Sequence, residues 1–457
     1  MARDELPPWV MDRLYANEHG LLRDRLGSAV RRVLDARIDD PFCRDELRSR
    51  VAKHKIAQAF AGPLVTPFGL SGEVTLGVDA RGRPVRVPVS MFNAHVCTLG
   101  GSGSGKTNRA RVWAIAIAAY VTGMWLLDIR KSEFPMLIVF LRWIGVTLEV
   151  VHGRDLRFNP LQVPVGVEPI SWSSLLADIL VHALGLPQRA SKLLHTTLIN
   201  LYREWGVHRA VPQPDASVRY PTLFDLRRAI ALQREAHPQA RAAVIDALDP
   251  VLLSLGTDVL GYSFGWTTWD LARRHLVFDL SGLARADQDL LLSSLLLSEF
   301  ASRVARGYSN HRMDLLILLD EAQRLFSASR PSPIAGELLG LVRGGGVGLD
   351  VSLQSAYDLH PSLLSNSAMK CLGRCGSATD YDVLGAAMGL TREQRVWAAQ
   401  HLQPGEFVVQ LGEGPERRPF LLRVPLLRVN ADTGHEGAPS SLKQLTVRPA
   451  EPLGGTS

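Results

Sequence analysis

The segment His95-Val-Cys-Thr-Leu-Gly-Gly-Ser-Gly-Ser-Gly-Lys-Thr107 contains the pattern G-x-x-x-x-G-K-T between Gly100 and Thr107. An apolar run, Val96 to Leu99, precedes this pattern, and a helix-like run, Arg109 to Val121, follows it. A P-loop requires this position between a strand and a helix. We therefore predict a nucleotide-binding site, since a flexible Gly/Ser linker would not end in Gly-Lys-Thr between two such elements.

The residue types indicate how the loop would hold a nucleotide. Glycines let the backbone turn so that successive N–H groups point at phosphate oxygens, at the positive end of the following helix. Lys106 would neutralise the β and γ phosphates, and the hydroxyl of Thr107 would complete a Mg²⁺ shell. The predicted cofactors are thus ATP and Mg²⁺. The predicted nucleotide-binding residues are Gly101, Ser102, Gly103, Ser104, Gly105, Lys106, Thr107 and Asn108.

Composition sets the broad class of the protein. With 457 residues, 46% of them apolar and 21% charged, the chain can bury at least one large core. Lysine and arginine exceed aspartate and glutamate by 51 to 45, which gives a net charge of +6. This mild excess permits a polyanionic partner such as nucleic acid without requiring one.

The cysteines and the N-terminus point to a cytoplasmic protein. Four cysteines, at positions 43, 97, 371 and 375, are too few and too scattered for a disulfide scaffold. The charged N-terminus lacks the apolar centre of a signal peptide. The most apolar run, residues 112–127, is interrupted by Gly123 and is too short for a transmembrane segment.

Hydrophobic periodicity divides the chain into five regions. A continuous apolar strand ending in Asp128 and a long helix from about Gln288 to Arg306 belong to an α/β core, which a mostly helical stretch interrupts. The expected regions are an N-terminal helical segment (1–70), a first part of the core with the P-loop (71–170), an all-helical insertion (171–262), a second part of the core (263–430) and a disordered tail (431–457).

Two carboxylates supply the second half of the predicted site. The apolar strand Leu315 to Leu319 delivers Asp320 and Glu321 to its carboxyl end, where open parallel sheets bind ligands. In a P-loop enzyme the first carboxylate holds Mg²⁺, often through water, and the second polarises the attacking water. Asp320 and Thr107 are therefore the predicted metal ligands, and Glu321 and Lys106 are predicted catalytic residues.

Three further residues are candidates for the chemistry. Gln354 ends the next apolar strand and could sense the γ phosphate. Arg343, which precedes Gly344, could stabilise transition-state charge across a subunit interface, and Arg374 is a weaker candidate for a similar role. Among so many arginines, most make surface or structural contacts.

The order of these motifs resembles the HerA/FtsK superfamily, and within it the HerA-type ATPases and the ATPases of type IV secretion and conjugation. Lys106 and Asp320 are about 210 residues apart, more than a compact nucleotide domain requires. The resemblance covers about residues 72–428. It also includes His95, Asp128 with Glu133, Phe158-Asn-Pro-Leu161, and Arg343-Gly-Gly-Gly-Val-Gly-Leu349 leading to Gln354.

The resemblance implies a RecA-like motor fold, a hexameric ring, and ATP hydrolysis coupled to the movement of DNA or sometimes protein through a central channel. It places the trans-acting arginine at Arg343 and the sensor at Gln354. Two features depart from the family. The usual Arg-Lys is Arg343-Gly344 here, and the N-terminal β-barrel of HerA is at most a hairpin behind a helical segment.

The leading hypothesis is a ring ATPase that translocates double-stranded DNA in DNA processing, mobile-element transfer or phage defence. A second hypothesis is a secretion-type ATPase that moves protein, or a DNA–protein complex, at a membrane channel. A third is a nucleotide-gated scaffold that organises an effector such as a nuclease.

Overall fold

The computed structural model describes residues 8–18, 21–36, 40–61, 70–233, 238–307, 310–329, 332, 344–412, 418–427 and 448–449. Within these residues, eleven strands form one sheet in the order β2-β1-β12-β11-β10-β3-β9-β8-β4-β7-β5. The strands are β1 (Val74–Asp79), β2 (Pro84–Val87), β3 (Val96–Leu99), β4 (Gly123–Asp128), β5 (Leu148–His152), β7 (His275–Asp279), β8 (Asn310–Leu319), β9 (Gly345–Leu353), β10 (Met369–Leu372), β11 (Glu406–Gln410) and β12 (Phe420–Arg423).

The sheet is mixed but mostly parallel. Neighbouring strands from β10 to β5 run parallel, whereas β11, β12, β1 and β2 extend the sheet antiparallel. Every residue of β3, β4 and β9 is buried, which explains why these strands read as continuous apolar runs. The predicted α/β fold with a P-loop strand in a parallel sheet is confirmed.

The two faces of the sheet bury separate clusters. Trp125 and Leu127 of β4 join one cluster, and the alternating residues Met124 and Leu126 join the other. The second cluster also holds the apolar face of the helix after the P-loop. The helices on this second face are α4 (Lys106–Ile117) and α5 (Leu137–Trp143).

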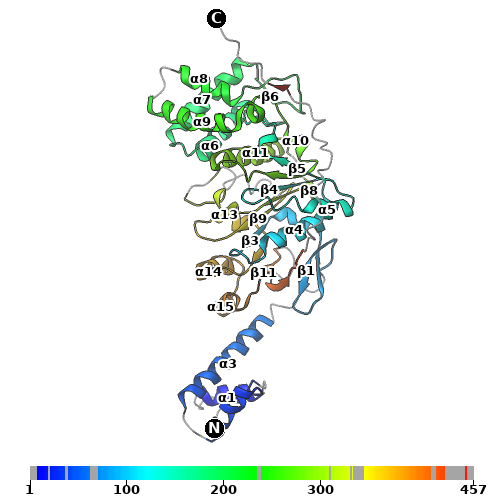
Figure 1. Ribbon diagram of the computed structural model, residues 1–457, viewed down its shortest axis with the longest axis vertical. Helices are drawn as coiled ribbons and strands as arrows, with labels where there is room; N and C mark the ends of the chain where they lie inside the picture. Colours follow the sequence, from blue (N-terminus) through cyan, green and yellow to red (C-terminus); the bar gives the residue numbers. More distant parts are fainter. Residues whose placement is uncertain are drawn as a thin grey trace.

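The first cluster continues into the helices between β5 and β7. Figure 1 shows α6 to α9 together at one end of the molecule, and their buried residues belong to the same cluster as Trp125. These helices are α6 (Pro169–Ala183), α7 (Arg189–Glu204), α8 (Leu223–Leu232) and α9 (Pro238–Leu260), followed by α10 (Thr268–Leu271) and α11 (Arg285–Ala305). The helices α6 to α9 lie in the stretch where a helical insertion is predicted, and their buried residues share one hydrophobic cluster with one face of the sheet.

Smaller helices complete the core at its other end. α13 (Pro361–Asn366), α14 (Ala378–Ala387) and α15 (Arg392–His401) contribute buried residues to the first cluster. A capping box begins α15, because Thr391 and Gln394 exchange side-chain to backbone hydrogen bonds. β1 pairs antiparallel with β2, and β11 with β12, so each pair of consecutive strands forms a hairpin.

The N-terminal helices form a small cluster of their own. α1 (Pro8–Glu18), α2 (Arg25–Asp35) and α3 (Pro41–Ala61) bury residues such as Ala16, Val30 and Leu47 against one another. They lie at the opposite end of the molecule from α6 to α9 (Figure 1), and α3 contacts α15. The division of the chain into domains stays a prediction.

A second, two-stranded sheet pairs β6 (Tyr262–Phe264) with β13 (Arg448–Pro449). β13 falls within the stretch predicted to be a disordered tail, so this prediction does not hold for Arg448 and Pro449, which pair antiparallel with β6. The other residues of that stretch, 431–447 and 450–457, lie outside the described residues.

Candidate functional site

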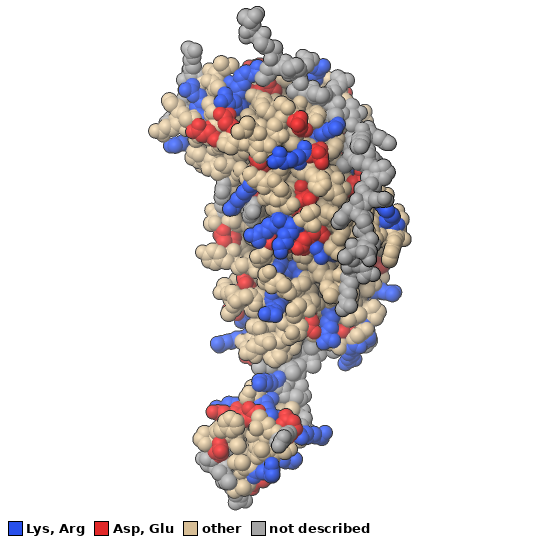
Figure 2. Space-filling model, viewed as in Figure 1, with Lys and Arg blue, Asp and Glu red and all other residues tan. Residues whose placement is uncertain are grey.

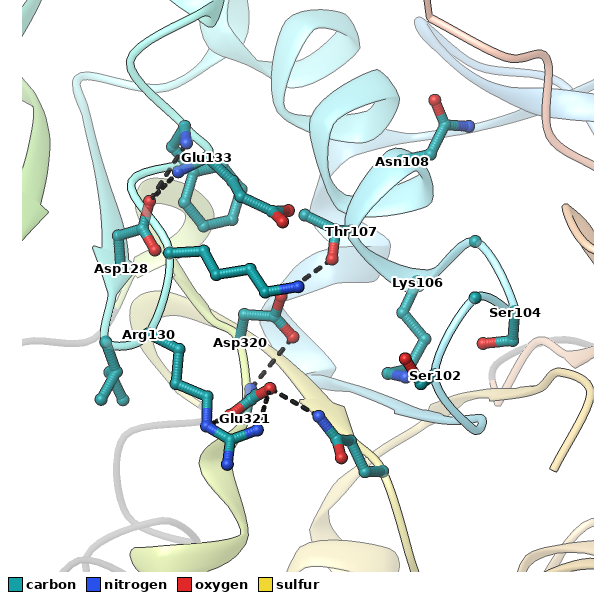
Figure 3. A pocket seen from close by; sticks show the side chains of 16 residues that line it. Ser102, Ser104, Lys106, Thr107, Asn108, Asp128, Arg130, Glu133, Asp320 and Glu321 are labelled. Atoms are coloured by element: carbon teal, nitrogen blue, oxygen red, sulfur yellow. Dashed lines mark hydrogen bonds and ion pairs between the residues drawn. The ribbon is translucent and has the colours of Figure 1, made fainter. Parts of the chain in front are cut away.

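A cleft of about 290 Å³ lies at the carboxyl edge of the parallel strands. It brings together the P-loop, the segment after β4, the acidic pair after β8 and the residue that follows β9 (Figure 3). Residues 102–108, 128–131, 133, 134, 320, 321 and 354 line it. The two halves of the predicted site therefore meet in one cleft, as expected for ligands of open parallel sheets.

Backbone contacts fix the shape of the P-loop. Gly103 and Gly105 have positive φ angles of 74° and 96°, which a side chain would strain. A Cβ at Gly105 would also lie 2.9 Å from the backbone nitrogen of Gly405. The N–H of Gly101 donates to the carbonyl oxygen of Arg374 at 2.7 Å. Arg374 thus contributes its backbone to the loop, while its side chain is exposed and lies outside the lining of the cleft.

Lys106 is buried and turned onto its own loop. Its Nζ donates hydrogen bonds to the carbonyl oxygens of Gly100 at 2.5 Å and Gly101 at 2.9 Å. Burial lowers the pKa of Lys106, and the nearby carboxylate of Asp320 opposes that shift. Phosphate oxygens are stronger acceptors for an ammonium group than these carbonyl oxygens. The phosphates of a bound nucleotide would therefore replace the carbonyl oxygens as the hydrogen-bond partners of Lys106.

Thr107 and Asp320 join the two halves of the site directly. The Thr107 hydroxyl donates to Oδ2 of Asp320 at 2.9 Å (Figure 3). Mg²⁺ prefers hydroxyl, carboxylate and water oxygens in an octahedral shell, and this pair presents oxygens of the first two kinds in the P-loop cleft. The donor set therefore fits the magnesium ion predicted from the sequence.

Glu321 is held by two side chains from different strand ends. Its Oε1 accepts from Nε2 of Gln354 at 2.5 Å, and its Oε2 lies 2.6 Å from Nε of Arg130 (Figure 3). Its backbone is left-handed, with φ of 58°. A non-glycine residue in this conformation is strained, and such strain persists where the surroundings enforce it, often at functional sites. Gln354 thus lies beside Glu321, as its position after β9 predicts.

The segment between β4 and α5 forms the wall opposite the P-loop. Asp128 accepts the backbone N–H groups of Glu133 at 2.5 Å and Phe134 at 3.2 Å. Burial raises the pKa of Asp128 to about 6, against the effect of these hydrogen bonds. The turn they stabilise presents Arg130 and Lys131 to the cleft. Neither cation is predicted as a site residue from the sequence, although they lie two and three residues after Asp128, the carboxylate that ends β4.

A buried ion pair lies beneath the P-loop helix. Both side chains are almost fully buried, and Arg109 donates to the two carboxylate oxygens of Asp350 at 2.5 and 2.8 Å. The guanidinium also stacks on Trp113, with its carbon 4.5 Å from the ring centroid. Burial opposes the charge, yet Asp350 raises the pKa of Arg109 overall. The pair fixes α4 to β9, and the sequence offered no signal for it.

The remaining predicted residues differ in position. Asn108 lines the cleft, but its amide bonds the carbonyl of Pro425 and the N–H of Leu427. His95 and Asn159, which carried part of the resemblance, are buried and hydrogen bonded away from the cleft. Arg343 lies outside the described residues, so its predicted role stays a prediction.

Comparisons with known proteins bear on the fold. No protein-family model matches the sequence, and a search of the curated proteins found no match. Among solved structures, VirB4 of Thermoanaerobacter pseudethanolicus superposes with a TM-score of 0.60 at 19% identity, covering 78% of this chain and 97% of VirB4.

The plasmid coupling protein TrwB is also similar in structure. Its complex with a non-hydrolysable ATP analogue gives a TM-score of 0.52 at 14% identity, covering 81% of this chain and 95% of TrwB. Its complex with ADP and Mg²⁺ gives 0.50 at 14% identity with the same coverage. The chain therefore has the α/β fold of VirB4 and TrwB, so the fold that the resemblance implied is confirmed.

Proposed function

We propose that the protein is an ATP-driven ring translocase of double-stranded DNA that hydrolyses ATP at subunit interfaces. The observation that carries the proposal is the 2.9 Å hydrogen bond between Thr107 and Asp320, with Glu321 and Gln354 beside it in the same cleft. A hydroxyl and a carboxylate for Mg²⁺, a P-loop lysine, and a carboxylate for the attacking water are the parts that phosphoryl transfer requires.

Each residue has a role in the proposed reaction. Backbone N–H groups of the P-loop and Lys106 would bind the β and γ phosphates, and Mg²⁺ would supply charge neutralisation between Thr107 and Asp320. Glu321 would orient and deprotonate the attacking water, and Gln354 would position Glu321. Arg343 of a neighbouring subunit is proposed to stabilise the transition state, as the family resemblance implies.

DNA is the proposed substrate because the chain is basic and the fold is that of the coupling protein TrwB. The net charge is +6, and Lys and Arg extend along the whole length of the face in Figure 2, interspersed with acidic residues. TrwB is described as a plasmid coupling protein. None of the helices in the described residues is long and apolar enough to cross a membrane. We propose a cytoplasmic hexamer.

The test is the rate of ATP hydrolysis with and without linear duplex DNA, together with the particle mass. We expect the rate to rise with DNA and this stimulation to fall steeply between about 50 and 200 mM salt, since counterion release governs DNA binding. Lys106→Ala should abolish hydrolysis. A mass of six chains is expected. Hydrolysis that survives Lys106→Ala would overturn the proposed site.

The second candidate is a secretion-type ATPase that moves protein or a DNA–protein complex. The similarity in structure to VirB4 favours it, since that match has the higher TM-score of those described. Two observations would support this function. The rate of ATP hydrolysis would not change when DNA is added, and the protein would copurify with a membrane complex. If the Glu321→Gln variant still forms a ring and keeps its biological activity, the result would instead support a scaffold for an effector nuclease.

A further inference from the structure

We propose that Arg130 is a nucleotide-responsive positioning residue for Glu321. Its guanidinium holds the Glu321 carboxylate and exchanges this ion pair for the γ phosphate when ATP binds, which releases the carboxylate to accept a proton from water. This inference rests on the proposed ATPase function of the same cleft.

The contacts of Glu321 show why a release step is needed. Nε of Arg130 lies 2.6 Å from Oε2, and Nη1 of Arg130 donates to Oε1 at 3.0 Å. Nε2 of Gln354 donates to Oε1 as well. Both carboxylate oxygens are therefore engaged by cationic or amide donors. Arg130 contacts both oxygens and so occupies hydrogen-bonding positions that an attacking water would need. The ion pair therefore opposes the role proposed for Glu321.

The backbone that carries Arg130 is fixed while its side chain is exposed. Asp128 holds the end of this segment through two backbone N–H groups. The Ser132 hydroxyl donates to Asp279 of β7 at 2.8 Å, and the amide of Gln288 on α11 donates to the carbonyl oxygen of Ile129 at 3.0 Å. The side chain of Arg130, in contrast, is 57% exposed. The head group can thus change partner without movement of the segment.

The location of Arg130 determines which partner it would take. It lines the same cleft as the P-loop, and Figure 3 shows its side chain extending from the wall opposite the loop to Glu321. A guanidinium binds phosphate in a bidentate manner, as it does carboxylate. A terminal phosphate carries more charge than one carboxylate, so a nucleotide with a γ phosphate competes for Arg130, and one without it competes less.

A purely structural role for the ion pair between Arg130 and Glu321 predicts a different result. A partly exposed pair contributes little to the stability of the fold, and its removal would change the affinities for ATP and ADP equally. With the exchange of partners, Glu321 instead affects the affinity for a γ-phosphate nucleotide relative to the affinity for ADP. This effect of Glu321 depends on the presence of Arg130.

The experiment is a double-mutant cycle on that affinity ratio, measured at equilibrium with a non-hydrolysable ATP analogue and with ADP, in the presence of Mg²⁺. Glu321→Gln removes the charge that competes for Arg130. It should therefore raise the analogue-to-ADP affinity ratio about threefold to fivefold, as expected for the loss of a partly exposed ion pair. In a chain that also carries Arg130→Gln, Glu321→Gln should leave the ratio unchanged within experimental error.

Lys131→Gln is the matched control, since it removes one positive charge from the same segment and the same cleft. The effect of Glu321→Gln should persist in that background. An equal effect of Glu321→Gln with and without Arg130, or no effect in either chain, overturns the inference while leaving the ATPase proposal intact. Failure of the unmodified protein to bind either nucleotide, or binding that Lys106→Ala does not weaken, overturns both.

Discussion

The hydroxyl of Thr107 donates a 2.9 Å hydrogen bond to Asp320, a residue 213 positions further along the chain. This bond connects the start of α4, the helix that follows β3, with the end of β8, and β9 lies between β3 and β8 in the sheet. The predicted consequence is that the two residues act as one magnesium-binding unit, because each presents an oxygen to the same place.

Replacing Asp320 with Asn should therefore raise the Mg²⁺ concentration needed for half-maximal hydrolysis. The change keeps an oxygen in place but removes its charge, and we expect a shift of about 10- to 100-fold, the range for losing a partner that orients a metal site. Hydrolysis titrated with Mg²⁺ measures it. Asp314→Asn, in the middle of β8, is the control. An unchanged magnesium requirement would contradict the assignment of Asp320.

Each feature that could be predicted from the sequence is recognised from residues that are adjacent along the chain. The P-loop is recognisable because its glycines, Lys106 and Thr107 are consecutive between a strand and a helix. Asp320 and Glu321 are recognisable because a strand buried on both faces is a continuous apolar run, and the pair ends such a run.

The features that the sequence did not predict depend on strand order. Arg130 meets Glu321 across 191 residues, and Arg109 meets Asp350 across 241. Each contact exists because β4 lies beside β8, or because α4 packs near β9. One arginine among many in a single sequence carries no sign of its partner. Only the three-dimensional structure therefore identifies the carboxylates that pair with Arg130 and Arg109.

Arg109 is predicted to be a major determinant of stability. Its pair with Asp350 is almost completely buried, so Arg109→Met leaves an uncompensated buried carboxylate and should lower the free energy of unfolding by about 3–5 kcal/mol. The double variant Arg109→Met, Asp350→Leu should recover most of this loss. Urea denaturation measures both.

The control for Arg109 is the surface pair of Arg227 and Asp249, whose side chains are 39% and 47% exposed. Arg227→Met should change the free energy of unfolding by no more than about 1 kcal/mol. Equal effects of Arg227→Met and Arg109→Met would show that burial does not set the contribution of these pairs.

Asp128 is predicted to make stability depend on pH between about 4 and 6. Burial raises the pKa of its carboxyl from 3.8 to about 6, so the folded protein binds more protons than the unfolded chain in this range. The free energy of unfolding must then decrease as pH rises from 4 to 6 and stay low above it.

The measurement compares wild type with Asp128→Asn, which keeps an acceptor for the N–H groups of Glu133 and Phe134 but does not titrate. Between about pH 4.5 and 7.5, wild type should lose about 2 kcal/mol of stability relative to the variant, the order expected for a shift of this size. A parallel pH profile of the two proteins would mean that Asp128 titrates normally.

Gln354 is predicted to affect turnover rather than binding. Its amide donates to Oε1 of Glu321 at 2.5 Å, and it lines the same cleft as Arg130. If Arg130 leaves Glu321 when ATP binds, Gln354 remains as the donor that orients the carboxylate toward water. Gln354→Ala should then lower kcat by about 100-fold, the order seen when a pre-positioned donor is removed, while the affinity for ATP changes little.

The matched control is Ser355→Ala, which should retain turnover because the hydroxyl of Ser355 contacts Asp380 instead. A loss of ATP affinity in Gln354→Ala as large as its loss of turnover would place Gln354 on the nucleotide itself, and Glu321 would then need another residue to orient it.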